Sequence, residues 1–307
     1  MVSKRLFLTL LIGLASLPAQ ASLNVFACEP EWADLAGILV PEARMTVATS
    51  AYQDPHYIEA RPSLIAAMRN ADIAVCTGAS LEAGWLPSLL RKAANRDIQP
   101  GRPGLFFAAD QVPLHQPHDH VDRSMGDVHP EGNPHVHLDP DALPRIADAL
   151  AERLASISPE QATDIQRRLL QWKVRWNLSK AEWRDKADDL KGMTVGVQHS
   201  GFHYLLRWLD VDVAFDLEPK PGLPPSASHL NAVLQDPDLP EASAIMVALY
   251  QDDRPAHWLS ERTHLPVLVL PGTVTGKEAA TSLESLLSHL VNELHQLAPK
   301  QTVESDG

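Results

Sequence analysis

Short apolar runs alternate with amphipathic stretches along most of the chain, and this pattern predicts parallel strands separated by helices. In the first half the expected strands are 23–28, 45–48, 71–76 and 105–109, and the expected helices are 32–39, 62–70 and 85–94. The alternation restarts with strands at 193–197, 211–215, 244–249 and 266–270 and helices at 202–209, 226–235, 255–263 and 279–297. We therefore expect two similar α/β lobes, each built on a parallel sheet with helices on both faces.

A polar loop and two helices join the predicted lobes. The loop runs from residue 111 to 140, a helix is expected at 141–157, and a second helix begins with Ser158 as N-cap and ends at Leu190. This second helix carries three tryptophans at helical spacing, which we assign to packing between the lobes: Trp172, Trp176 and Trp183. The expected organisation is an N-terminal lobe at 22–157, a connecting long helix at 158–191, a C-terminal lobe at 192–300 and a tail at 301–307. A rigid connecting helix predicts little hinge closing on ligand uptake.

The first 21 residues have the pattern of a cleavable signal peptide. Lys4 and Arg5 precede an apolar run at 6–17, and the segment ends in Ala19-Gln20-Ala21. The run is shorter than the ~20 residues that span a bilayer, and no later segment is long and apolar enough. We therefore expect an exported protein that does not span the membrane.

Composition restricts the class of partner, and the two cysteines can be either bonded or free. Hydrophobic residues make up 45% of the chain and charged residues 21%, which is typical of a globular protein. The formal net charge of −13 disfavours nucleic acid as a partner. Cys28 and Cys76 end two predicted buried strands, so they form a disulfide if those strands are neighbours and remain two buried thiols if not.

Three histidines lie in loops where the ends of predicted strands converge. His56 follows the second strand, His135 lies at the close of the long loop, and His199 follows the first strand of the second lobe. Neutral imidazole nitrogens are good ligands for Zn²⁺, and three protein ligands plus one more complete a tetrahedron. Because ligands bind beyond the carboxyl ends of parallel strands, we expect a metal site in the cleft between the lobes.

The motifs around these histidines resemble a known family. They are Asp54-Pro55-His56, Asn133-Pro134-His135, His199-Ser-Gly-Phe-His-Tyr204 and Glu218-Pro-Lys-Pro-Gly-Leu-Pro-Pro225. Together they are similar to the periplasmic solute-binding proteins of ABC importers for zinc and manganese, over nearly the whole mature chain. The resemblance implies Zn²⁺ capture between two lobes and delivery to a membrane permease driven by an ATPase. It also implies His56, His135 and His199 as ligands. Histidine at the third position is typical of zinc-type members, whereas manganese-type members usually have glutamate there, so Mn²⁺ is the less favoured metal.

One position departs from the family pattern. Most relatives have an acidic ligand after the last strand, but Leu268–Thr275 contains no carboxylate. The fourth ligand is then Asp252, Glu218 or water, and Asp252 is our first choice because it follows the strand at 244–249. The alternative role for Asp252 and Asp253 is to cap the next helix. His137 stands where relatives often have tryptophan, so it is either a spare ligand or a packed ring, and we favour packing or contact with a ligand residue.

The long loop contains a further group of histidines. We interpret this group as an accessory loop that captures zinc weakly and is not needed for the high-affinity site: His115, His118, His120 and His129. The remaining histidines are assigned to helix surfaces or loops: His203, His229, His257, His264, His289 and His295.

Two other functions fit three histidines in an exported protein. A secreted zinc hydrolase would use the same open site, but no His-Glu-x-x-His segment is present. The serine in Gly196–Gly201 is shifted by one position from the Gly-x-Ser-x-Gly pattern of a nucleophile elbow, so the segment does not indicate an esterase. A periplasmic zinc buffer or chaperone without a transporter is the other alternative. Our preferred interpretation is a monomeric binding protein that is not an enzyme.

Overall fold

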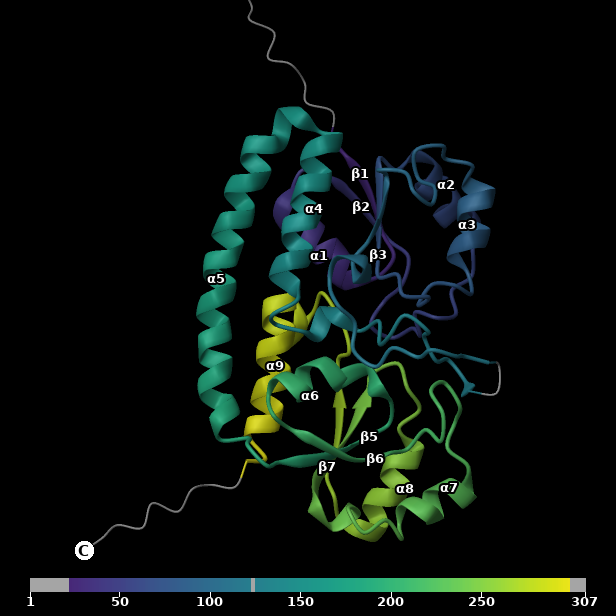
Figure 1. The fold of residues 1–307 in the computed structure, drawn as a ribbon, viewed down its shortest axis with the longest axis vertical. Helices are drawn as coiled ribbons and strands as arrows, with labels where there is room; N and C mark the ends of the chain where they lie inside the picture. The colour runs from purple at the N-terminus through teal and green to yellow at the C-terminus, as the bar shows by residue number, and fades with distance from the viewer. Residues whose placement is uncertain (1–21, 123–124, 299–307) are drawn as a thin grey trace, which may run out of the picture.

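The computed structural model describes residues 22–122 and 125–298. The predicted signal peptide, 1–21, and the predicted tail, 301–307, lie outside the described residues. The described chain forms two lobes, one above the other, with long helices along one side (Figure 1). The prediction of two similar parallel-sheet lobes is confirmed.

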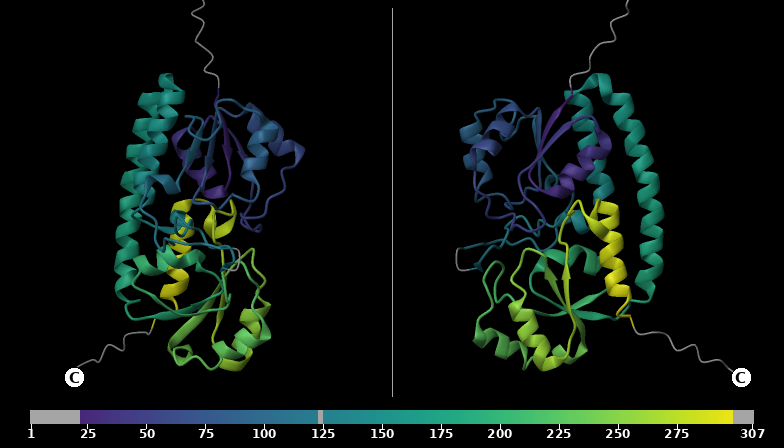
Figure 2. Two further views of the ribbon diagram at one scale, coloured as in Figure 1. Left: turned by 45° about the vertical axis from the view of Figure 1, so that its right-hand side comes forward. Right: turned by 180° about the vertical axis from the view of Figure 1, so that it is seen from behind.

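The N-terminal lobe is built on a four-stranded parallel sheet with the order β2-β1-β3-β4. Its strands are β1 (Asn24–Ala27), β2 (Arg44–Val47), β3 (Ile73–Cys76) and β4 (Leu105–Phe107). Side chains alternate between two cores, as the period of two in a strand requires. Val25 and Ile73 pack with Trp32 on one face, whereas Phe26 and Ala74 pack on the other. Helices α1 (Pro30–Leu39), α2 (Pro62–Asn70) and α3 (Leu86–Ala93) cover these faces (Figure 2).

The C-terminal lobe repeats this topology in the order β6-β5-β7-β8. Its strands are β5 (Thr194–Val197), β6 (Asp212–Asp216), β7 (Ala242–Ala248) and β8 (Val267–Leu270), and its helices are α6 (His203–Trp208), α7 (Ala227–Val233), α8 (Arg254–Thr263) and α9 (Leu283–His295). The register shifts between Val195 and Gly196. Gly196 is needed there because a Cβ would lie 2.1 Å from the ring of Phe215.

Helix α5 (Ala162–Asp188) extends along both lobes and packs against α1, α4 (Leu143–Ile157) and α9 (Figure 1). Trp176 donates to the Pro140 carbonyl at 2.9 Å, and Trp183 donates to Ser288 of α9 at 3.0 Å. The tryptophans therefore fix the helix against both halves of the molecule. The helix predicted from Ser158 begins later, because Pro159–Gln161 forms a 3-10 turn first.

The last helix also begins later than predicted. The prediction started it at residue 279, but α9 begins at Leu283. Ser282 and Ser285 form a reciprocal capping box, in which each side chain accepts from the backbone N–H of the other residue. This pair satisfies the first orphan N–H groups and fixes the start of the helix.

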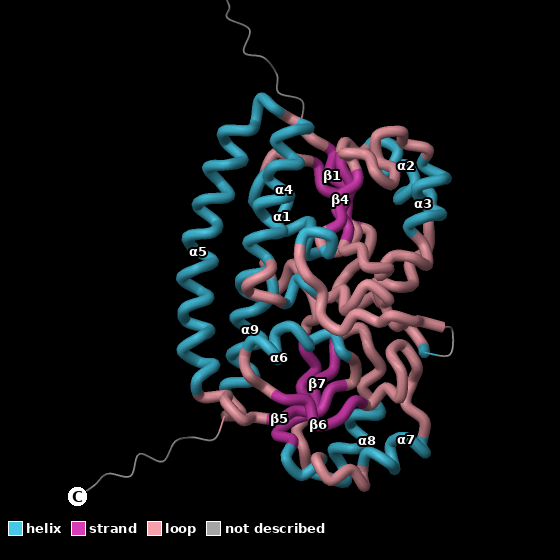
Figure 3. Tube along the Cα trace, in the orientation of Figure 1, coloured by secondary structure: helices cyan, strands magenta, loops and turns pink. Residues whose placement is uncertain are grey.

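Loops fill the space between the two sheets (Figure 3). These loops follow the carboxyl ends of the strands, so the polar segments of both lobes meet there. At the edge of this region Cys28, which follows β1, and Cys76, the last residue of the neighbouring strand β3, are joined in a disulfide. No helix in the described ranges has both the length and the apolar character needed to cross a membrane.

Candidate metal centre

The cleft between the lobes is lined by the loops that carry the predicted ligands. His56 follows β2, His135 precedes the short 3-10 turn at Val136–Leu138, and His199 follows β5. His56 and His199 face the same cavity of about 650 Å³. His135 and His199 share two neighbouring cavities. His199 is therefore the side chain at which the three cavities meet.

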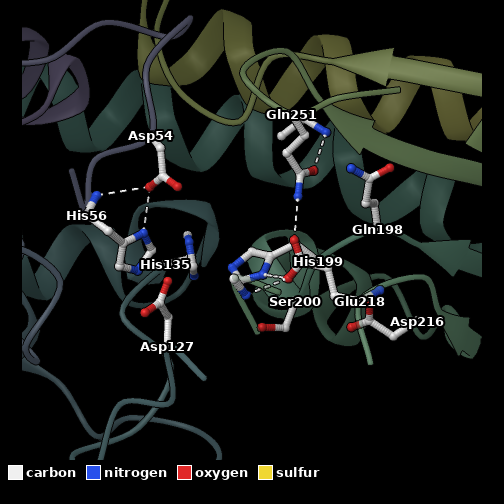
Figure 4. Close-up of polar contacts among 12 residues, drawn as sticks. Asp54, His56, Asp127, His135, Gln198, His199, Ser200, Asp216, Glu218 and Gln251 are labelled. Atoms are coloured by element: carbon white, nitrogen blue, oxygen red, sulfur yellow. Dashed lines mark hydrogen bonds and ion pairs between the residues drawn. The ribbon is translucent and has the colours of Figure 1, made fainter. Parts of the chain in front are cut away.

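The side chain of His56 is oriented by Asp54. Asp54 Oδ1 lies 2.7 Å from His56 Nδ1 and accepts the His56 backbone N–H at 3.0 Å (Figure 4). Burial opposes ionisation of Asp54, but these hydrogen bonds outweigh it and lower the pKa of Asp54 below its usual range. An ionised carboxylate requires N–H at Nδ1 of His56. The Nε2 lone pair of a neutral ring is then left for another partner.

His135 is held in the same way by Asn133. The amide oxygen Oδ1 lies 2.8 Å from His135 Nδ1 and accepts the backbone N–H of His135 at 3.0 Å. Burial, together with the neighbouring His199, holds the pKa of His135 well below its ordinary value. The ring is therefore neutral at physiological pH. The Asp-Pro-His and Asn-Pro-His motifs thus share one local geometry, in which the first side chain orients the imidazole two residues later.

His199 is oriented from another loop. Glu218 Oε2 lies 2.9 Å from His199 Nδ1 (Figure 4). The same oxygen accepts the Gly222 N–H at 2.8 Å. Gln251 Nε2 donates to the other oxygen of Glu218 at 3.4 Å. Burial opposes protonation of His199, but the hydrogen bond and charge of Glu218 outweigh it and raise the pKa of His199. His199 Nε2 is buried and has no hydrogen-bond partner.

The structure brings the imidazoles together as two pairs. The ring centroids of His135 and His199 are 5.4 Å apart, and those of His56 and His129 are 5.2 Å apart. Within the described ranges, the only three potential ligand atoms that all lie within 4.8 Å of one another belong to Cys28, Cys76 and Glu82, and there the sulfurs are bonded to each other. The predicted histidines therefore share a cleft without forming one coordination sphere in this conformation.

Asp252, the first choice for a fourth ligand, is paired elsewhere. Its carboxylate accepts from Arg254 Nε at 2.8 and 2.9 Å, and its side chain is half exposed. The N-cap of α8 is Asp253, whose side chain makes no capping bond, whereas Asp252 Oδ1 accepts the backbone N–H of Arg254, the first residue of the helix, at 3.2 Å. Arg254, only two residues away, competes for this carboxylate. Glu218, the other carboxylate considered for this position, contacts His199 Nδ1 and thus orients a ligand in this conformation.

His137 connects the two lobes. Its Nε2 lies 2.8 Å from the Gly272 carbonyl, and its Nδ1 lies 3.3 Å from Glu31 Oε1. Thr273 also donates to Glu31. His137 is therefore a packed ring that fixes the loop after β8.

The four histidines of the predicted accessory loop do not behave as one group. His118 and His120 are exposed, whereas His115 is partly buried and stacks on Tyr204 with the centroids 4.5 Å apart. His129 lies in the cleft, with its Nε2 3.2 Å from His56 Nε2. Burial and the neighbouring His56 lower the pKa of His129 to about 4. The position of His129 depends on a contact with a residue far from it in the sequence, and no local sequence pattern signals such a contact.

Sequence reasoning also missed a group of buried carboxyls behind the cleft. Glu29 and Glu82 both accept from the backbone of Thr77, at 3.2 and 2.6 Å. Burial and the nearby Glu82 raise the pKa of Glu29 well above its ordinary value, and burial raises the pKa of Glu82 to about 7. Two carboxyls this close retain a proton that neither would hold in water.

Comparisons with known proteins agree with this fold. A family model described as ZnuA, the periplasmic component A of the zinc-uptake complex, matches residues 25–297. A crystal structure of ZnuA is similar with a TM-score of 0.76 and 19% identity, covering 91% of this chain and 100% of that one. A ZnuA variant lacking residues 138–173, with zinc bound, gives 0.74 and 18%, covering 92% and 100%. The solute-binding protein FpvC from Pseudomonas aeruginosa, in complex with Mn²⁺, gives 0.75 and 19%, covering 91% and 99%. None of the curated protein sequences matches the chain.

Proposed function

Because this chain belongs to the ZnuA family of periplasmic zinc-uptake components, we propose that it captures Zn²⁺ in the interlobe cleft and delivers it to an ABC-type importer. The ligands in this proposal are His56, His135 and His199. The protein acts as a binding protein whose cargo is the metal ion, with a membrane permease and its ATPase as partners. Capture takes place in the periplasm, after export by the signal peptide at 1–21.

One observation carries the proposal: all three imidazoles have Nδ1 committed to an oxygen of their own lobe. The oxygens belong to Asp54, Asn133 and Glu218. Metal-ligating histidines almost always have such a partner on the second nitrogen, because it fixes the ring and makes the free nitrogen more basic. In each case Nε2 is the nitrogen left for a ligand bond.

Zinc is the cargo that this set of donors favours. Imidazole nitrogens suit Zn²⁺, whereas Mn²⁺ prefers carboxylate and water oxygens. The carboxylates of Asp54 and Glu218 lie behind the rings and offset the charge of the ion without binding it directly. Binding requires the pair His135–His199 to approach His56, and the loops that carry these residues supply this movement.

Titration of the metal-free protein with Zn²⁺ by calorimetry tests the site. We expect one high-affinity ion per chain for the wild type and a large loss of affinity for His199→Ala. His120→Ala is the matched control, because its side chain is 83% exposed and should leave the affinity unchanged. Wild-type affinity in His199→Ala would remove this residue from the site.

Uptake measurements separate an importer subunit from a zinc buffer or a hydrolase. Vesicles that contain the permease and its ATPase should accumulate zinc only when the protein is added, and His199→Ala should not support accumulation. A buffer would bind zinc without supporting uptake, and a hydrolase would turn over ester or peptide substrates in its zinc form.

A further inference from the structure

His129 lies beside His56, one of the proposed zinc ligands. Its Nε2 is 3.2 Å from Nε2 of His56, and the two rings stack with an interplanar angle of 27°. Two nitrogens bound to one zinc ion at about 2.0–2.1 Å and at the tetrahedral angle are about 3.3–3.4 Å apart. The two nitrogens therefore already have the separation of one edge of a zinc tetrahedron.

The protonation of the pair also suits a metal ion. Asp54 accepts from Nδ1 of His56, so a neutral His56 ring presents a lone pair toward His129. The ring of His129 is also hydrogen-bonded to the backbone of Ala79. A zinc ion bound by both Nε2 atoms would use both lone pairs and displace any proton held between them, as metal binding to imidazole generally does.

The segment that carries His129 is held in place from both lobes. Tyr57 of the N-terminal lobe donates to Asp127 at 2.8 Å, and the Asp127 N–H donates to the Pro221 carbonyl of the C-terminal lobe, also at 2.8 Å. Ser80 donates to Glu131 at 2.9 Å on the other side of His129. His129 is thus positioned by contacts on either side of it, whereas His118 and His120 of the same loop are exposed.

A glycine makes this close approach possible. Gly126 has φ +81°, and a Cβ there would lie 2.3 Å from the Pro221 carbonyl oxygen. The backbone of this segment therefore passes directly against the second lobe. This contact brings His129 into a cavity that it shares with His135 and His199.

From this geometry we infer that His129 is the fourth zinc ligand and that the cleft holds the ion with four imidazoles. The inference rests on the proposed function and deepens it. It replaces the acidic ligand that the loop after β8 lacks, and it gives the site an all-nitrogen donor set. Such a set favours Zn²⁺ over Mn²⁺ more strongly than three histidines and a carboxylate would.

The test combines calorimetry with X-ray absorption at the zinc edge on the full mature chain. In the wild type we expect the signature of four imidazoles, and in His129→Ala that of three. The zinc affinity of His129→Ala should fall at least as far as after loss of an outer-shell partner, about 10- to 100-fold. His129→Asp should recover part of the affinity and lower the preference for Zn²⁺ over Mn²⁺, a change that a purely structural role of His129 would not cause. His120→Ala should change neither the affinity nor the imidazole count.

Two results would overturn the inference while leaving the proposed function intact. One is an unchanged imidazole count and affinity in both His129→Ala and His129→Gln. The other is an unchanged equilibrium affinity with slower zinc uptake, which would make His129 a transient contact of the entering ion. Wild-type affinity in His199→Ala, or no zinc binding by the wild type, would instead refute the proposed site as a whole. Thermal melting of the metal-free variants shows whether each one folds.

Discussion

Glu218 provides a graded test of how an outer carboxylate controls zinc binding. Its Oε2 is 2.9 Å from His199 Nδ1, and the two side chains are only 11% and 8% exposed. Glu218→Gln keeps an oxygen that can accept from Nδ1 but removes the charge, whereas Glu218→Ala removes both. Loss of such a partner typically lowers metal affinity 10- to 100-fold, or about 1.4–2.7 kcal/mol. At pH 8 we expect Glu218→Gln to lower the zinc affinity about 10-fold and Glu218→Ala to lower it about 100-fold.

The pH dependence of these variants gives an independent check. The hydrogen bond that His199 donates to Glu218 raises the pKa of His199, so protons compete with zinc in the wild type as the pH falls through that value. Without the carboxylate the pKa of His199 falls, and this competition weakens. The affinities of the wild type and the variants should therefore converge between pH 8 and pH 5.5, as measured by calorimetry. The reasoning fails if Glu218→Ala binds like the wild type at pH 8, or if the gap widens in acid. Glu182→Gln, on the exposed face of α5, is the control.

Two further predictions concern stability. Because burial raises the pKa of Glu82 from 4.5 to about 7, the native state retains a proton that the unfolded chain releases, so the free energy of unfolding should decrease by up to about 3 kcal/mol as the pH rises through this range. Glu82→Gln should flatten that decrease in urea titrations at pH 5 and 8, and an unchanged slope would contradict the assignment. Replacing Cys28 and Cys76 by alanine should lower the free energy of unfolding by about 4 kcal/mol, because the disulfide closes a loop with a sequence separation of 48. A variant as stable as the wild type in urea would show that loop closure is not the main contribution.

The fold could be predicted from the sequence because its signals are local and repeated. Each buried strand is a short apolar run, and each helix has a periodic apolar face. The starts of two helices were wrong, since a 3-10 turn at Pro159–Gln161 and a cap at Ser282 decide them through backbone hydrogen bonds. Such bonds depend on neighbours that hydrophobic periodicity does not specify.

The sequence predicts only those features of the candidate site that follow from the direction of the strands. The carboxyl ends of parallel strands meet, so His56, His135 and His199 were expected in one cleft, where the structure places them. His129 was assigned to an accessory loop, because its place depends on contacts of Asp127 with both lobes. The choice of Asp252 as the fourth ligand rests on its position after a strand alone. It does not take into account that Arg254, two residues later, pairs with this carboxylate.

The shared geometry of Asp54-Pro55-His56 and Asn133-Pro134-His135 makes each tripeptide a self-contained cassette. Each tripeptide supplies an acceptor, a proline with fixed φ and the imidazole at three consecutive positions. The tripeptide therefore orients its own histidine ring. The surrounding loops can therefore vary in length and composition while the histidine still presents the lone pair of Nε2 to the cleft. An acceptor-Pro-His tripeptide in a loop beyond the carboxyl end of a parallel sheet is thus a sequence signature to look for in other chains.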